Sequence, residues 1–431
     1  MIAIYTNRIT PRLQYTLNLV FKTVLKVDYV LFHDKQSFTA SDLPKISYCQ
    51  EKIKGEIHFF ATSLLFESNI QKQNIEIRKI DGFPTFYYYN KNAILSFDAF
   101  AMIFYLVSRY EEYTETQRDK HGRFRATLSL AYQNDFLKTP LVNHLCLKIQ
   151  QLLIQKYPSL KFPKQQFQFL PTYDIDYAWS FLHKGLKRTL GGYARAAITG
   201  NFQEIIERFQ VQFGFKNDPF HTFGILDNFH QQHRLSPIYF FLIGDISYFD
   251  KNIPHENLTF QRLIQQIATQ YKIGLHPSYI SNQFLEKVAM EQERLATITN
   301  QKIIRSRQHF LKLSISKTYQ NLIQNNILED YTMGYATQVG FRASIATPYF
   351  WYDLENEKAT NLKIFPFQIM DVTLTEYLKL NMEDSKVLIQ EIIENTKAVN
   401  GLFSTLWHNN NINEPIGQLY LNVLPSYTRQ Q

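Results

Sequence analysis

The segment Pro171-Thr172-Tyr173-Asp174-Ile175-Asp176 joins the end of an expected β-strand to two carboxylates. An apolar run, Phe167 to Leu170, precedes it, and a helix-like segment begins near Tyr177. A strand that delivers two carboxylates, at i and i+2, to its C-terminal end is a suitable place for a metal or acid/base site. The alternative is that the two aspartates cap the next helix, where Asp is favoured. Because two aspartates follow one apolar strand, we favour the functional interpretation.

The composition is that of an ordinary globular protein. The chain has 431 residues, of which 45% are hydrophobic and 19% charged, so we expect two or three folded domains and no extensive disorder. Lys and Arg number 46 against 38 Asp and Glu, a net charge of +8. The excess is spread along the chain without a block of like charges, so no nucleic-acid partner is expected.

Cysteine usage and hydropathy predict a cytoplasmic protein. The two cysteines, Cys49 and Cys146, form neither a metal-type pair nor a disulfide framework. The first residues, Met1 to Arg8, resemble a first β-strand rather than a signal peptide. No stretch reaches ~18 uninterrupted apolar residues, so no transmembrane helix is expected.

Residues 1–160 are predicted to form a smaller N-terminal α/β domain of unknown role. Strands are expected at 2–6, 29–32 and 57–60, and helices at 12–25, 93–109 and 141–157. The charged stretch 109–123 is interpreted as a solvated loop with local ion pairs rather than a binding surface. A linker with two prolines, 158–164, leads to a second domain, 166–431.

The second domain is predicted to be a parallel α/β sheet or barrel, because short apolar strands alternate with amphipathic helices. Strands are expected at 236–245, 273–276, 303–310 and 401–408, and helices at 258–271, 286–300, 318–326 and 384–395. In such folds the polar residues at the carboxyl ends of the strands face one mouth. The residues with that position are Asp174, Asp176, His276, Arg307, His309 and His408.

The helix expected from residue 179 to 190 is basic and amphipathic. Trp179, Leu182, Leu186 and Leu190 share one side, and Lys184, Lys187 and Arg188 lie on or near the other. Such a helix can lie on an anionic membrane, or it can bury its apolar stripe in the core. The burial interpretation is favoured, and peripheral membrane contact is kept as the alternative.

The strand-end residues fit a metal-assisted hydrolase. One carboxylate and two imidazoles are a minimal set for a catalytic zinc-type site with open positions. A second carboxylate can act as general base, a further histidine as general acid, and an arginine can orient the base. A single histidine is more often a structural residue. Several histidines at the ends of successive strands favour a functional site.

Five segments, in order, resemble the NodB-type polysaccharide deacetylases. Thr172 to Asp176 is similar to the family's first motif, and Pro237 to Asp245 to its second strand. Ile273 to His276 resembles the strand that leads into the metal-binding histidine motif. Gly340-Phe341-Arg342 is similar to the arginine segment, and Leu406-Trp407-His408 to the final motif. The resemblance covers about residues 166–425, as in a branch of the family with an additional N-terminal domain.

The resemblance implies a distorted (β/α) barrel of polysaccharide-deacetylase type that removes an acetyl group from an N-acetylated (or O-acetylated) sugar of a surface polysaccharide or its precursor. Such an enzyme is a hydrolase acting on C–N bonds other than peptide bonds, with a divalent metal, most often zinc. The implied site residues are Asp174 as base, Asp176 and His276 as metal ligands, His408 as acid, Asp371 as its orienting partner, Arg342 as the arginine near the base, and Arg307, Tyr279 and Trp407 as substrate-binding residues.

One position departs from the family pattern. The family has a second histidine four residues after the first, and here that position is Ile280, which cannot bind metal. His309 is the candidate replacement because it also follows an apolar strand. The arginine role stays open between Arg307 and Arg342.

Two other functions remain open at this point. Ile280 also fits a catalytically degenerate deacetylase fold that binds or scaffolds a glycan. A metal-free glycosidase could use Asp174 with another carboxylate about 5–9.5 Å away across the sugar, but it would leave the histidines without a role.

Overall fold

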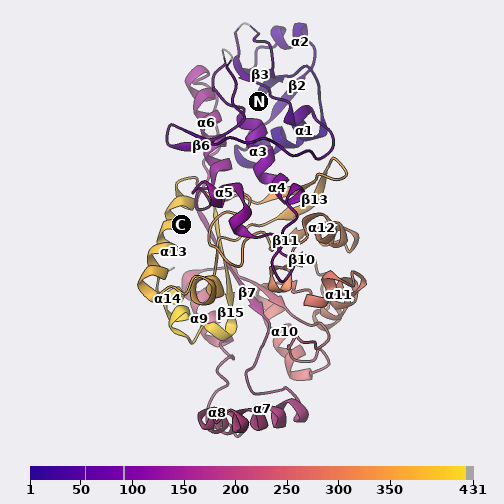
Figure 1. Cartoon of the computed structure of the whole chain (residues 1–431), viewed down its shortest axis with the longest axis vertical. Helices are drawn as coiled ribbons and strands as arrows, with labels where there is room; N and C mark the ends of the chain where they lie inside the picture. Colours follow the sequence, from indigo (N-terminus) through magenta and orange to yellow (C-terminus); the bar gives the residue numbers. More distant parts are fainter. Residues whose placement is uncertain (54, 91–92, 424–431) are drawn as a thin grey trace.

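The computed structural model describes residues 1–53, 55–90 and 93–423, which form a mixed α/β structure around two sheets (Figure 1). A four-stranded sheet lies in the N-terminal part and a nine-stranded sheet in the rest. A two-stranded ribbon, β5 (Arg78–Ile80) with β6 (Phe83–Thr85), is separate from both.

The N-terminal sheet is entirely parallel, with the order β2-β1-β3-β4. Its strands are β1 (Ile2–Tyr5), β2 (Tyr29–Phe32), β3 (Lys45–Cys49) and β4 (Ile57–Phe60). Its main helices are α1 (Pro11–Leu17), which continues as a π-helix, η1 (Asn18–Val24), then α2 (Lys35–Ala40), α3 (Ala99–Val107), α4 (Tyr110–Thr114), α5 (Leu130–Gln133) and α6 (Leu141–Lys156). Every residue of α3 is buried, as expected for a helix whose sequence is apolar on all sides.

The second sheet has the order β12-β13-β11-β10-β9-β8-β7-β15-β14, and only β12 runs antiparallel to its neighbour. The strands are β7 (Gln168–Ile175), β8 (Ile238–Phe241), β9 (Lys272–Leu275), β10 (Arg305–Ser306), β11 (Glu329–Asp330), β12 (Tyr349–Asp353), β13 (Lys358–Ile364), β14 (Ile369–Met370) and β15 (Leu402–His408). Consecutive strands are neighbours from β7 to β11, and the last strand, β15, pairs with the first, β7. The carboxyl ends of these parallel strands therefore meet around one mouth.

Helices connect the strands of this second sheet. They are α7 (Leu186–Ile198), α8 (Phe202–Gln212), α9 (Phe223–His233), α10 (Leu258–Gln270), α11 (Glu286–Thr299), α12 (Ile315–Gln324), α13 (Met382–Lys397) and α14 (Pro415–Val423). The predicted helices 258–271, 286–300 and 384–395 are confirmed to within a few residues, because each carries an apolar stripe that the sheet buries.

The predicted 179–190 helix is wrong in position. Residues 177–185 form no helix; Trp179 is buried in the core instead. The helix begins at Leu186 and pairs with α8 in a hairpin that projects from the body (Figure 1).

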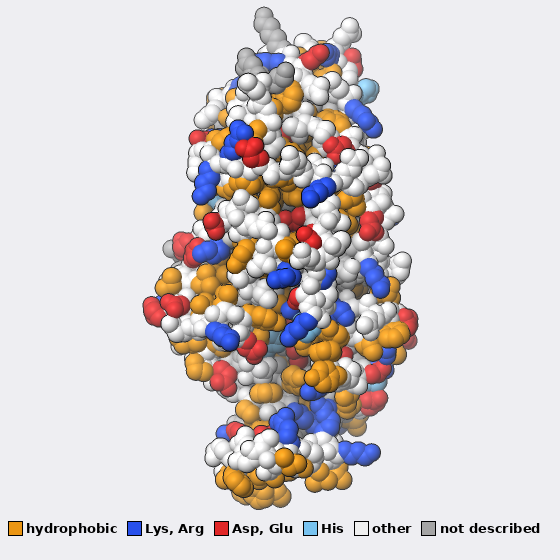
Figure 2. Space-filling model, viewed as in Figure 1, with side chains coloured by type: hydrophobic (Ala, Val, Ile, Leu, Met, Phe, Trp, Pro, Cys, Tyr) orange, Lys and Arg blue, Asp and Glu red, His pale blue; other side chains and the backbone are white. Residues whose placement is uncertain are grey.

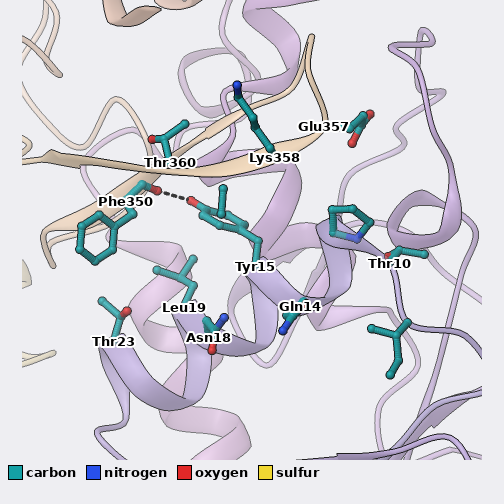
Figure 3. Close-up of a pocket in the computed structure, with 13 residues that line it drawn as sticks. Thr10, Gln14, Tyr15, Asn18, Leu19, Thr23, Phe350, Glu357, Lys358 and Thr360 are labelled. Carbon is teal, nitrogen blue, oxygen red and sulfur yellow. Dashed lines mark hydrogen bonds between the residues drawn. The ribbon is translucent and has the colours of Figure 1, made fainter. Parts of the chain in front are cut away.

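The two parts of the chain meet where α1 crosses the β12–β13 hairpin. Arg12 is fully buried and forms an ion pair with Glu357, and the Tyr15 hydroxyl donates to the carbonyl of Phe350 at 2.7 Å. A pocket of about 580 Å³ lies at this junction, with Gln14 and Thr360 among its lining residues (Figure 3). It holds no cluster of acid, base or metal-binding groups among the residues that line it.

The charged stretch 109–123 is only in part the solvated loop with local ion pairs that the sequence predicts. Residues 114, 116–118 and 120 are exposed, and Arg123 pairs locally with Asp119 at 2.7 Å. Arg109 is buried instead and binds Glu111 at 2.6 Å and Glu112 at 2.8 Å, and Glu112 in turn binds Arg342 at 2.6 Å. Buried charges need partners of this kind, because desolvation otherwise disfavours the charged form. The first residues of the stretch are therefore an internal ionic contact between the N-terminal part and the second sheet.

Within the part of the chain that the structure describes, none of the helices combines the length and the apolar character needed to cross a bilayer.

Candidate metal centre and active site

The site lies at the carboxyl end of the nine-stranded sheet. The register of the sheet sets His408 of β15 opposite Asp174 of β7, and Asp176 comes one residue after β7 ends. His276 follows β9 directly. Side chains alternate between the two faces of a strand, so Thr172 and Asp174 share one face of β7 while Tyr173 and Ile175 pack on the other. The side chains that the sequence places at strand ends therefore converge.

Three of them form a candidate metal site. One ligand atom each from Asp176, His276 and His309 lies within 4.8 Å of the others. His276 Nε2 is 3.2 Å from one Asp176 oxygen, and His309 Nε2 is 3.5 Å from the other. Ligand atoms of a tetrahedral site with bonds of about 2.1 Å lie roughly 3.4 Å apart. The three residues thus stand at the spacing that a zinc-sized ion needs.

The hydrogen bonds made by the Nδ1 atoms of the two histidines also support a metal site. His276 Nδ1 donates to the carbonyl of Arg307 at 2.6 Å, and His309 Nδ1 donates to Asp250 at 2.8 Å. Each bond leaves the Nε2 atom facing Asp176, the arrangement that orients ligating histidines. Asp176 Oδ1 is buried and faces His276 Nε2 at 3.2 Å without a well-aligned hydrogen bond. A buried carboxylate oxygen opposite imidazole nitrogen atoms fits a bound cation.

The electrostatics of the ligand set are strongly coupled. Burial opposes ionisation of Asp176, but the charges and hydrogen bonds of His309 and His276 outweigh it and hold the pKa of Asp176 well below its usual range. Burial likewise lowers the pKa of His309, but Asp176 and Asp250 outweigh it and raise that pKa from 6.5 to about 9. A metal ion at these atoms therefore competes with a proton on His309.

The backbone at His309 is unusual. The predicted strand 303–310 is only two residues long, Arg305–Ser306, and a 3₁₀ turn, η5 (His309–Leu311), follows. Phe310 and Leu311 both have positive φ, 58° and 52°. Left-handed backbone at two successive non-glycine residues is strained, and such strain concentrates at functional sites.

A second constellation surrounds Asp174. Arg307 Nη1 donates to Asp174 Oδ1 at 2.9 Å, and Asp174 Oδ2 is 3.6 Å from His276 Nε2. Arg307 is fully buried: its other groups donate to Thr172 Oγ1 at 2.6 Å and to the Tyr331 carbonyl at 3.0 Å. These three contacts engage Nε, Nη1 and Nη2, so Arg307 orients Asp174 from a buried position.

A third constellation holds His408 across the mouth. Its Nδ1 donates to Asp371 at 2.8 Å, and its Nε2 is 3.9 Å from Asp176 Oδ2. Asp371 also accepts from the backbone N–H of His408 and from the Asn411 side chain. Burial lowers the pKa of His408, but Asp371, with Asp176 and Asp174 farther away, outweighs it and raises that pKa from 6.5 to about 10.

A cleft of about 270 Å³ opens beside these groups. Its lining includes the ligand residues and His408, and also an apolar wall. The apolar wall is formed by Leu311, Ala336, Met370, Val372 and Leu406. Tyr177, Phe310 and Tyr377 also line it.

The structure contradicts three of the sequence-predicted roles. Arg342 does not reach the mouth, because Glu112 binds its Nε at 2.9 Å and its Nη2 at 2.6 Å. Trp407 is fully buried and stacks on Tyr420, since it points to the opposite face of β15 from His408. Tyr279 stacks on Phe249 at 4.1 Å and is not among the residues that line the cleft.

Two residues of the site were missed by sequence reasoning. Asp250 lies in a loop after β8, nine residues beyond the strand, where no spacing marks it. Arg123, from the charged N-terminal stretch, lines the cleft and donates to the Phe310 carbonyl at 2.9 Å. The dense charge of 109–123 was the available signal for Arg123.

Comparisons with known proteins follow the two parts of the chain. Residues 2–158 match the model of a family of unknown function (DUF7033). No curated protein matches the chain.

Solved structures similar to this one include two proteins named as polysaccharide deacetylases. One, from Mycobacterium smegmatis, is 11% identical, with a TM-score of 0.42, over 63% of this chain and 87% of its own. The other, from Bacillus cereus, is 11% identical, with a TM-score of 0.31, over 61% of this chain and 88% of its own.

Proposed function

We propose that the chain is a metal-dependent hydrolase that removes an acetyl group from an N-acetylated (or O-acetylated) sugar of a surface polysaccharide or its precursor. The observation that carries the proposal is the convergence of Asp176, His276 and His309 beside the Arg307-bound carboxylate of Asp174. We also propose that the nine-stranded sheet is a distorted (β/α) barrel that stays open between its edge strands, β12 and β14, since β7 to β11 follow in order and β15 returns beside β7.

The residues that would hold the ion are Asp176, His276 and His309, with Zn²⁺ the best fit to one carboxylate and two imidazoles. A bound divalent cation supplies Lewis-acid chemistry to the acyl group. His309 Nε2 lies 3.5 Å from Asp176 Oδ2, so His309 can supply the ligand that Ile280 cannot. This proximity weakens the case for a catalytically degenerate, glycan-binding protein.

Asp174 and His408 divide the proton transfers. Asp174, fixed by Arg307, is placed to accept a proton from the attacking water. His408, fixed by Asp371, is placed to donate a proton to the leaving amine or alcohol. The apolar wall of Met370 and Leu406 suits the methyl of an acetyl group, because burying it there removes apolar surface from water.

A metal-free glycosidase is less well supported. That chemistry needs two carboxyl groups on opposite sides of a glycosidic bond. Asp174 and Asp176 instead both lie within 3.6 Å of the same nitrogen, His276 Nε2. The cytoplasmic location and the lack of a nucleic-acid partner stay predictions of the sequence.

The test is acetate release from N-acetylated sugar oligomers by the purified chain loaded with Zn²⁺. Asp174→Asn and His276→Ala should each reduce the rate by at least about 10³-fold, because each removes a group needed at the reacting centre. His255→Ala is the matched control, since this histidine pairs with Glu256 away from the site. Acetate release at the wild-type rate in both site variants would refute the proposal, and sugar cleavage without acetate release would assign the site to glycoside hydrolysis.

A further inference from the structure

The α7–α8 hairpin exposes an unusual amount of apolar surface. The exposed side chains are Leu186 (75%), Leu190 (58%), Ile198 (87%), Phe202 (69%), Ile206 (50%), Phe209 (49%), Phe213 (65%) and Phe215 (76%). The helical ones recur three, four or eight residues apart, so each helix presents one apolar stripe. Figure 2 shows these orange side chains gathered along the end of the molecule farthest from the N-terminal part.

The sheltered face of the hairpin holds a buried charge beside Ala196 and Val211, whereas the large apolar side chains lie on the exposed face. Arg208 is buried between the helices, binds Glu204 at 2.6 Å and lies 4.7 Å from the ring of Phe181. Gly192 allows this approach, since a Cβ there would lie 2.4 Å from Arg208 Nη1. An ion pair on the sheltered face and phenylalanines on the exposed face are suited to an apolar environment in contact with the exposed face.

The charge of the hairpin indicates which kind of apolar environment its exposed face contacts. Residues 184–216 carry six Lys or Arg and two Glu. Figure 2 shows basic side chains between the apolar end and the body. A second copy of the chain seated on this face would bring two basic surfaces together, whereas an anionic lipid surface neutralises them. Helices of 13 and 11 residues are too short to cross a bilayer but can lie in its interface.

The connections of the hairpin are anchored beside the candidate active site. Its first helix begins ten residues after Asp176. The Asn409 side chain donates to the carbonyls of Tyr177 at 2.9 Å and Phe220 at 2.7 Å. Asp218 accepts three backbone N–H groups of residues 180–182. The segments that carry the hairpin are therefore tied to the body near Tyr177, which lines the cleft.

We propose that the α7–α8 hairpin docks this protein on an anionic lipid membrane, with its apolar stripes in the interface and its basic residues at the headgroups. This goes beyond the hydrolase function and does not depend on it. Combined with that function, docking would bring the cleft to glycans carried at a membrane surface.

The test is co-sedimentation of the full chain with vesicles of 70% phosphatidylcholine and 30% phosphatidylglycerol, and with pure phosphatidylcholine. We expect binding to the anionic vesicles and at least about tenfold weaker binding to the neutral ones. Ile198→Ser with Ile206→Ser should weaken binding by at least about tenfold, because both side chains leave the interface. The matched control is Ile154→Ser with Val387→Ser, two exposed apolar residues on α6 and α13.

A second variant, Lys187→Glu with Arg195→Glu, tests the charge without removing apolar surface, and circular dichroism verifies that both variants fold. His276→Ala should bind vesicles like the wild type, which separates docking from the proposed hydrolysis. Absence of binding to the anionic vesicles, or equal binding by hairpin and control variants, would overturn the inference. So would a wild-type dimer that dissociates in the hairpin variant without vesicle binding, since the apolar face would then belong to a second copy.

Discussion

Glu291 on α11 should make this protein less stable as the pH rises. Its carboxylate is buried and accepts from the backbone N–H of Ser278 at 2.9 Å and from the Ser278 hydroxyl. Burial outweighs these bonds and raises the pKa of Glu291 from 4.5 to about 7. The folded state therefore favours the protonated acid. Its contribution to the free energy of unfolding is fully present below pH about 4.5 and is lost as the pH rises through about 7.

The size of the loss follows from the pKa difference. A rise from 4.5 to about 7, at 1.36 kcal/mol per unit, corresponds to about 3 kcal/mol over the whole window. Most of it, about 2 kcal/mol, falls between pH 5 and pH 8. Glu291→Gln keeps the shape of the protonated acid and does not titrate. The variant should therefore lack this part of the pH dependence.

Urea unfolding at pH 5 and pH 8, in the presence of a chelator, measures the effect. All three tryptophans, Trp179, Trp351 and Trp407, are buried in the part of the chain that contains the nine-stranded sheet, so their fluorescence reports on the unit that carries Glu291. The wild type should lose about 2 kcal/mol more than Glu291→Gln between the two pH values. Glu286→Gln, on the exposed side of the same helix, is the control and should behave like the wild type. Equal pH dependence of wild type and Glu291→Gln would refute the reasoning.

Three other perturbations test the site and its surroundings. His309→Ala should weaken Zn²⁺ binding by at least about 100-fold in a chelator competition, whereas His255→Ala should not; unchanged affinity would remove His309 from the ligand set. Asp371→Asn should lower kcat by about 10²-fold with Zn²⁺ still bound, because His408 loses the carboxylate that orients it; loss of the metal instead would point to a structural role. Arg342→Met should lower the free energy of unfolding by about 3–5 kcal/mol, because it leaves Glu112 buried with one partner fewer. The Zn²⁺ affinity of the folded variant should not change. A large drop in that affinity would contradict the placement of Arg342 outside the site.

The sequence by itself determined local secondary structure and the position of the candidate site at the carboxyl ends of the strands. Strand β4 has the predicted bounds, and α10 ends within one residue of its prediction, because apolar periodicity decides which face each element buries. Strands alternate with helices in the sequence, and parallel strands end at one edge of a sheet. Together these two features predicted that Asp174, Asp176, His276 and His408 lie close to one another. These conclusions need only neighbouring residues.

Only the tertiary structure decided which side chains from distant segments meet. Arg307 and Arg342 were both candidates for the arginine beside the base. Arg307 binds Asp174, which is 133 positions away in the sequence, whereas Arg342 binds Glu112 of the N-terminal part. Asp250, the partner of His309, has no local sequence signal. Likewise the apolar stripe predicted for residues 179–190 favours burial in the core, and only the projection of the hairpin leaves Leu186 and Leu190 outside. Periodicity reports that a face is apolar, and the packing of remote elements decides what covers it.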